Sequence, residues 1–308
     1  MSGQLGASRE QIRARGERAS AHDLDPVMTP VPGGSSDVPV IKIVSHRSWR
    51  IDWQELYEYR DLLYFLVYRD VRAKYKQTVM GLGWALIQPV VSMIVFTVIF
   101  GGVAKISSDG LPYSIFSYAA LVPWTYFQGA LEGSTSSLIT QSALLTKVYF
   151  PRLIIPLGVI FGQLVNFGIA MMLLFVMMVY YGIAPTPWVA FLPVLILMMM
   201  MTAGGAGFLL TAMAIQYRDV KYGITLLSNV LMYAAPVVYP VSLIPEQYRL
   251  LYALNPMVGV IEGFRAALLG SVPMPWDLIL VGGVMSVCVA FAGALYFKSV
   301  EGVFADVA

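Results

Sequence analysis

The sequence has few charged residues and almost no cysteine or histidine. Charged residues make up 12% of the 308-residue chain and apolar residues 58%, whereas soluble domains carry roughly a quarter charged and about half apolar residues. The single cysteine, Cys288, lies in an apolar run, which excludes a disulfide framework or a cysteine-rich metal site. The two histidines, His22 and His46, lie in a polar N-terminal segment, so the apolar part of the chain offers no histidine for a metal or acid–base site.

Nucleotide-binding motifs are absent as well. The sequence contains neither the phosphate-binding loop Gly-x-x-x-x-Gly-Lys-Ser/Thr nor a Gly-x-Gly-x-x-Gly motif after a strand. The apolar segments carry almost no ionisable residues, whereas ion-coupled transporters and intramembrane proteases or transferases need charges or histidines at bilayer depth. We therefore expect no catalytic residue, no metal and no cofactor on this chain.

Long apolar runs recur instead, and they predict an all-α integral membrane protein. A bilayer core about 30 Å thick requires about 20 mainly apolar residues per helix. The runs predict six transmembrane helices within a membrane domain at 81–300, at about 82–103, 113–131, 154–181, 189–215, 223–239 and 278–297. The Ser-, Gly- and Pro-rich segment 1–48 is predicted to be a disordered cytoplasmic tail, and 301–308 a second cytoplasmic tail.

The segment 49–80 is predicted to contain an amphipathic helix in the membrane interface. An apolar stretch at 62–68 runs directly into a basic stretch at 69–76 with aromatic residues interleaved. The apolar and charged positions do not separate into clean helical faces, but their order along the chain is typical of an interfacial helix. A solvated basic linker is the alternative.

The positions of lysine and arginine predict the orientation. With the N-terminus inside, seventeen of these residues lie in cytoplasmic segments and three outside, namely Lys105, Arg249 and Arg265. Because loops on the cytoplasmic side are enriched in Lys and Arg, both termini are predicted to be cytoplasmic.

The apolar part of residues 241–276 is too short to span the membrane, yet the segment is too apolar for an exposed loop. Prolines at 245, 256, 273 and 275 forbid one continuous helix. We expect two short re-entrant helices, at about 245–254 and 256–269, dipping into the outer leaflet. Glu262 and Arg265 are three residues apart, so they would share a helical face and could pair.

Aromatic residues gather near the ends of the predicted spans. They could form an ordinary interfacial belt, or a stacking surface for sugar rings, whose C–H faces pack on aromatic planes. The candidates for a substrate channel are Trp84, Tyr113, Phe116, Trp124, Tyr126, Phe127, Tyr233 and Tyr239.

A series of short motifs in a fixed order identifies a family. The motifs are YRDVRAKYK at 68–76, GLGWALIQP at 81–89, LVPWTYF at 121–127, LLTKVYFPR at 144–152, IP at 155–156, YRDV at 217–220, YP at 239–240 and LNP at 254–256. Over about residues 50–300 the chain resembles ABC-2 type permease subunits, in the branch that exports polysaccharides and polyol phosphates such as O-antigen, capsule and teichoic acid.

The resemblance implies partners and a substrate. It implies a homodimer that forms a channel in the bacterial inner membrane and binds two copies of a separate ATPase, which carries the ATP and Mg. The substrate would be a polysaccharide linked to a polyprenyl diphosphate lipid, and no nucleic acid would be bound. An ABC-2 exporter of a drug or small lipid is the alternative, and a membrane-embedded enzyme or a scaffold is a more distant one.

The resemblance also implies three sets of site residues. The lipid diphosphate would meet the donors Arg69, Arg72, Lys74 and Lys76, although attraction to anionic lipid explains the same charges. The ATPase would press on Lys147, Tyr149, Phe150, Pro151, Arg152, Arg218 and Asp219. The alternative is that Lys147 and Arg152 only set the orientation of the chain in the membrane. A periplasmic gate would comprise Pro245, Asn255, Pro256, Glu262 and Arg265, with a static plug as the alternative.

Overall fold

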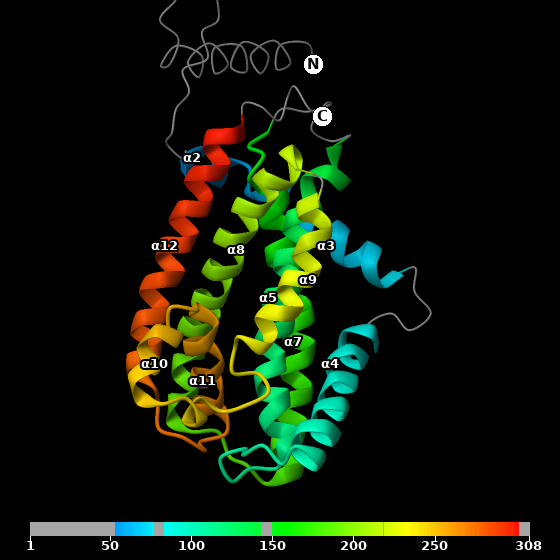
Figure 1. Cartoon of the computed structure of the whole chain (residues 1–308). Coiled ribbons are helices and arrows are strands. Elements are labelled where there is room, and N and C mark those ends of the chain that lie inside the picture. Colours follow the sequence, from blue (N-terminus) through cyan, green and yellow to red (C-terminus); the bar gives the residue numbers. More distant parts are fainter. Residues whose placement is uncertain (1–52, 77–82, 143–149, 218, 302–308) are drawn as a thin grey trace, which may run out of the picture. The chain divides into compact units, whose positions relative to one another are not determined.

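The computed structural model describes residues 53–76, 83–142, 150–217 and 219–301, and all regular elements in these ranges are helical (Figure 1). This confirms the predicted all-α class. The long helices are α3 (Arg60–Lys76), α4 (Gly83–Phe96), α5 (Tyr113–Thr140), α7 (Ile154–Tyr181), α8 (Leu192–Gln216), α9 (Asp219–Tyr233), α11 (Pro256–Leu268) and α12 (Trp276–Val300). The shorter elements are α2 (Trp53–Glu58), η1 (Thr97–Val103), η2 (Pro187–Phe191), η3 (Val241–Leu243) and α10 (Glu246–Tyr252). The predicted tail at 1–48 lies outside the described residues.

Four of the described helices are long and apolar enough to cross a membrane. They are Gly83–Val103, Ile154–Tyr181, Pro187–Gln216 and Trp276–Val300, and they coincide with the first, third, fourth and sixth predicted spans. Each holds an uninterrupted apolar run of the length that a bilayer core requires. The chain is therefore a multi-pass membrane protein.

Helices α5 and α9 differ from the predicted second and fifth spans. Helix α5 continues to Thr140, beyond the predicted end at 131. In this added part the hydroxyl side chains find partners within the helix, because Thr135 donates to the Leu131 carbonyl at 2.7 Å and Ser137 to the Ser134 carbonyl at 2.6 Å. Its 28 residues give a length of about 42 Å, but its polar residues keep it below the hydropathy of a typical span. Helix α9 has only 15 residues and ends at Tyr233. That α5 and α9 are the second and fifth of six membrane spans therefore stays a prediction.

Helix α5 lies at the centre of the bundle. It packs against α4, α7, α8, α9 and α11, and its side chains supply much of the main hydrophobic core. A second hydrophobic cluster joins the C-terminal end of α12 to α3 and to the start of α7, with Leu66, Phe150 and Phe297 among its buried members. This second cluster marks one end of the bundle, and α10 lies against the N-terminal half of α12, towards the other end (Figure 1).

Helices α8 and α12 approach each other backbone to backbone. A Cβ atom added at Gly293 would overlap the carbonyl of Gly205, and one added at Gly205 would overlap the carbonyl of Val289. Small residues of this kind let helices pack closely where no hydrophobic effect drives them together.

Two short helices, α10 and α11, occur where the prolines predict them. Asn255 caps α11 by accepting a hydrogen bond from the Met257 amide at 3.1 Å, and Pro256 occupies the first helical position. All 13 residues of α11 are buried, and the helix packs against α5, α8 and α12. Helix α11 is therefore a core element of the chain itself, and its position in the outer leaflet stays a prediction.

Candidate functional site

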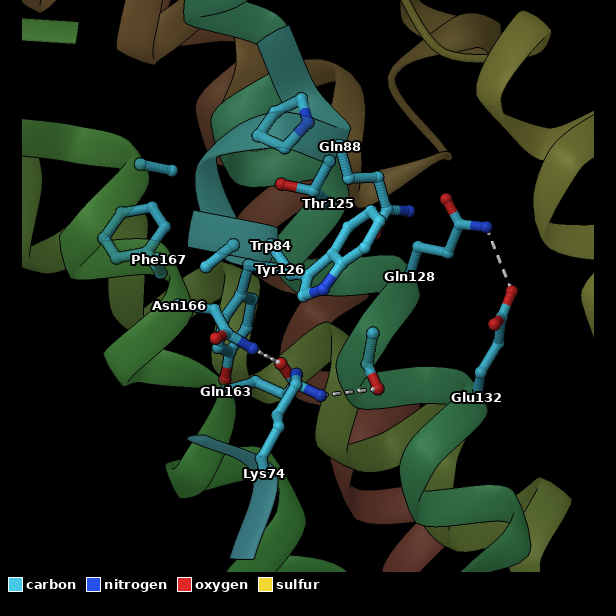
Figure 2. A pocket seen from close by; sticks show the side chains of 14 residues that line it. Lys74, Trp84, Gln88, Thr125, Tyr126, Gln128, Glu132, Gln163, Asn166 and Phe167 are labelled. Atoms are coloured by element: carbon cyan, nitrogen blue, oxygen red, sulfur yellow. Dashed lines mark hydrogen bonds between the residues drawn. The ribbon is translucent and has the colours of Figure 1, made fainter. Parts of the chain in front are cut away.

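A cavity of about 390 Å³ opens between α3, α4, α5 and α7 (Figure 2). We call it the amide cavity, because three glutamines and an asparagine contribute to its wall. Its lining residues are Lys74, Trp84, Ala85, Gln88, Pro89, Thr125, Tyr126, Gln128, Gly129, Glu132, Gln163, Asn166, Phe167 and Ala170.

Helical periodicity brings these polar residues to one place. Thr125, Gln128 and Glu132 are spaced by three and four residues on α5, and Gln163 and Asn166 by three on α7, so each set lies on one face of its helix. Gly129 lets the α7 amide approach closely, since a Cβ atom there would lie only 3.2 Å from the Gln163 side chain.

Hydrogen bonds hold part of this polar lining in place. Gln163 donates to the Gly129 carbonyl at 3.4 Å and accepts a hydrogen bond from Asn166 (Figure 2). Glu132 accepts hydrogen bonds from Gln128 at 3.0 Å and from Ser228 of α9 at 2.5 Å. Glu132 therefore links α5 to α9 as well as bordering the cavity.

The charges at the cavity are few and of opposite sign. Lys74 reaches it from α3, towards Gln163 and Asn166, whereas Glu132 lies on the α5 wall (Figure 2). The Lys74 side chain is exposed, but partial burial of its amine lowers the pKa below its usual range, because a charged amine loses some of its solvation there. In the described part of the chain, no group of His, Cys, Asp and Glu side chains could hold a metal ion. The lining can donate and accept hydrogen bonds, but it offers no nucleophile paired with a base.

Most of the polar residues of the cavity were not among the predicted site residues. Gln88, Gln128, Glu132, Gln163 and Asn166 lie within or at the edge of predicted spans, and a signal for them was present. They are amides and a carboxylate at helical spacing inside apolar runs, where each polar group needs a partner.

The predicted channel aromatics divide into two groups. Tyr113, Phe116, Trp124 and Phe127 are buried in the core of the single chain, where they pack among α5, α11 and the segment before α10. In the single chain none of these four residues is more than 8% exposed, and a channel-lining role for them stays a prediction. By contrast, Trp84 and Tyr233 are 56% and 53% exposed, Tyr239 is partly exposed and Tyr126, although buried, borders the amide cavity.

The four basic residues of α3 have different surroundings. Arg69 pairs with Asp70 at 2.8 Å and donates to Gln141 at 2.8 Å, which fastens α3 to the end of α5. Arg72 contacts Tyr68 on the exposed side of α3, and Lys76 is exposed. Only Lys74 borders the cavity, so the structure does not gather the four into one site.

Part of the predicted ATPase-contacting set can be located. Lys147, Tyr149 and Arg218 lie outside the described residues. The others lie at one end of the bundle: Phe150 and Pro151 are buried, Arg152 donates to the Glu301 carbonyl at 2.6 Å, and Asp219 is exposed at the start of α9.

The predicted gate residues belong to α10, α11 and the turn between them. Pro245 precedes α10, and the Asn255 side chain also donates to the Ala234 carbonyl at 3.3 Å. The predicted pairing of Glu262 with Arg265 is confirmed at 2.8 Å. Their side chains are only 5% and 1% exposed, so the pair lies inside the chain.

The sequence is also similar to those of known transport proteins. Residues 61–269 match the family described as ABC-2 type transporter. The chain is 30% identical over 255 residues to the O-antigen export system permease protein RfbA of Myxococcus xanthus, covering 82% of this chain and 97% of that protein. It is 22% identical over 248 residues to a protein of the same name from Klebsiella pneumoniae, covering 80% and 95%. The polysialic acid transport protein KpsM of Escherichia coli is 20% identical over 209 residues, covering 66% and 80%.

Proposed function

The chain belongs to the ABC-2 type transporter family, and from that premise we propose that it is the channel-forming permease of an ATP-driven polysaccharide exporter. The substrate would be a polysaccharide linked to a polyprenyl diphosphate, moved across the bacterial inner membrane. The observation that carries this proposal is the extent of the similarity to an O-antigen export permease, which covers 97% of that protein.

The energy source would be a separate ATPase. The sequence has no phosphate-binding loop, so ATP and Mg would bind to two copies of a partner subunit. Phe150, Arg152 and the C-terminal end of α12 lie together at one end of the bundle, which is the cytoplasmic end in the predicted orientation. We propose that the partner docks there and presses on the segment that precedes α7.

The channel would form between two copies of this chain. Exposed apolar side chains on α4 and α9, such as Val91, Ile94, Leu226 and Val230, give surfaces that a second copy or lipid would cover. Helix α9 is too short to cross alone, and its Ser228 donates a hydrogen bond to Glu132 of α5. A glycan path along α4 and α9 would use the exposed rings of Trp84 and Tyr233.

Deletion of the gene for this chain in its host tests the proposal. The long-chain surface polysaccharide should disappear, and the lipid-linked glycan should accumulate on the cytoplasmic side of the membrane. A catalytically inactive variant of the ATPase that copurifies with the chain should reproduce both effects. Normal surface polysaccharide, together with an altered drug sensitivity or lipid composition, would instead favour export of a drug or small lipid.

A further inference from the structure

We propose that the amide cavity is a sugar-binding site, which receives an uncharged sugar residue of the transported glycan within a single chain. The inference rests on the proposed function for the presence of a glycan. It goes beyond that function by assigning a ligand to the cavity between α3, α4, α5 and α7 of one chain. A channel between two copies would not require a binding site there.

The dimensions and the polar lining of the cavity suit a sugar. Its volume of about 390 Å³ falls within the about 300–1,000 Å³ that is usual for small-molecule sites. The Gln88 amide presents two donor hydrogens and an acceptor oxygen, and the amides of Gln128 and Gln163 each keep a donor hydrogen beyond the hydrogen bonds they make to Glu132 and Gly129. Sugar hydroxyls also both donate and accept, so this lining can satisfy them in several orientations.

Aromatic rings complete the lining. Trp84 of α4, Tyr126 of α5 and Phe167 of α7 all border the cavity (Figure 2). Flat apolar rings beside hydrogen-bonding groups match the two kinds of surface on a sugar, namely its C–H face and its hydroxyl edge. A purely polar cavity would suit water equally well, but these rings favour a ligand with an apolar face.

The charges of the cavity argue against the diphosphate of the lipid as its ligand. Recognition of phosphate usually gathers several cationic donors. Among the described residues Lys74 is the one cation that lines the cavity, Glu132 would repel an anion, and partial burial lowers the pKa of Lys74. One positive and one negative group on the lining suit a neutral ligand.

One amide of the lining, that of Gln88, is available for hydrogen bonds to a ligand. The Gln88 side chain lines the cavity and makes no hydrogen bond to another described residue. The side chain is exposed, so a ligand in the cavity can reach its amide. A hydroxyl-bearing ligand would satisfy it, whereas a lipid chain would not.

Protection of a cysteine in the cavity tests the proposal. The variant Ala85→Cys would be made with Cys288→Ser, and its reaction rate with a small maleimide measured on purified full-length chain in lipid nanodiscs. The probes are oligosaccharides released by mild acid from the surface polysaccharide of the host, and inorganic pyrophosphate. We expect the oligosaccharides at millimolar concentration to slow labelling at least threefold, and pyrophosphate to have no effect. The unsubstituted chain is the control, because Cys288 lies outside the cavity and its labelling should not respond.

A second substitution tests whether the protection of the cysteine depends on a polar side chain of the cavity. Gln88→Leu should abolish the protection and lower export several-fold, whereas Gln216→Leu, at the exposed end of α8, should change neither. Protection by pyrophosphate alone, no protection by either probe, or protection that survives Gln88→Leu would each overturn the assignment. These outcomes leave the proposed function intact, since that function fails only if deletion of the chain leaves the surface polysaccharide unchanged.

Discussion

The two sides of the bundle differ in the surroundings of their polar side chains. On the side of α8, α11 and α12, which we call the closed side, the buried charges find their partners within the chain. On the side of α3, α4 and α7, the open side, polar side chains face a cavity. Helix α5 borders both sides, so the difference arises from the helices packed around it rather than from two separate domains.

The closed side is illustrated by Arg265. Its guanidinium pairs with Glu262 at 2.8 Å, donates to the carbonyls of Val237 and Phe116 at 3.0 and 3.4 Å, and lies 3.6 Å from the centre of the Phe116 ring. These contacts join α11 to the start of α5 and to the segment before α10. The side chains of this pair are almost fully buried, so a ligand in solution or in the membrane cannot reach them.

The open side is illustrated by Gln88, whose amide borders the cavity and has no partner among the described residues. The comparison teaches that a polar residue in a membrane helix is not by itself evidence of transport. The number of partners that the chain itself supplies separates a structural group from one available to a ligand.

The largest expected effect is on the closed side. Arg265→Met should lower the free energy of unfolding by about 3–5 kcal/mol, because it leaves the Glu262 carboxylate buried without its partner. The measurement is SDS-induced unfolding in mixed micelles, followed by circular dichroism. The matched control is Arg249→Met on α10, whose pair with Glu246 is 3.7 Å long and largely exposed and should contribute about 0–1 kcal/mol. Equal losses in the two variants would contradict the distinction.

A smaller effect is expected where α8 meets α12. Gly293→Ala should cost about 1–3 kcal/mol, because the new methyl group would overlap the Gly205 carbonyl and push the helices apart. On the open side, Gly162→Ala in α7 meets no atom within 4 Å and should be neutral or stabilise by up to about 1 kcal/mol. The same unfolding assay measures both, and a loss in Gly162→Ala would show that the open side is as tightly packed as the closed one.

The third effect concerns the link between α5 and α9. Ser228→Ala should cost about 1 kcal/mol, because it removes the hydrogen bond from Ser228 to Glu132. Amide hydrogen exchange in α9 should also become faster, whereas the exposed Thr225→Ala on the same helix should change stability by no more than about 0.5 kcal/mol. Unchanged exchange in α9 would mean that apolar packing alone holds this helix.

The smallest effect is a pH dependence from Lys74. Burial disfavours its charged form, so its pKa in the folded chain lies below that of the unfolded chain. Between these two values the unfolded chain binds more protons, and the stability of the fold should therefore rise as the pH increases. Competitive amine labelling should give a midpoint for Lys74 below the usual lysine value of about 10.4, and Lys74→Gln should remove this part of the pH dependence. An unshifted midpoint would show that the cavity leaves Lys74 fully solvated.

The sequence by itself determined the membrane class, four of the spans and the short proline-bounded helices. Apolar runs of about 20 residues and prolines act locally, so their consequences can be read without knowing the neighbours. The pairing of Glu262 with Arg265 was predictable for the same reason, because residues three apart on a helix are adjacent.

Only the tertiary structure decided which residues face the core and which face a cavity. Phe116 and Trp84 are both aromatic residues in predicted spans, yet one is buried and the other exposed, because the outcome depends on which helix covers each face. Glu132 marked the end of a span in the sequence, but Ser228, 96 residues away, supplies the partner that keeps it inside the bundle. Contacts between distant segments carry no local signature, so the amide cavity became visible only when α3, α4, α5 and α7 were placed together.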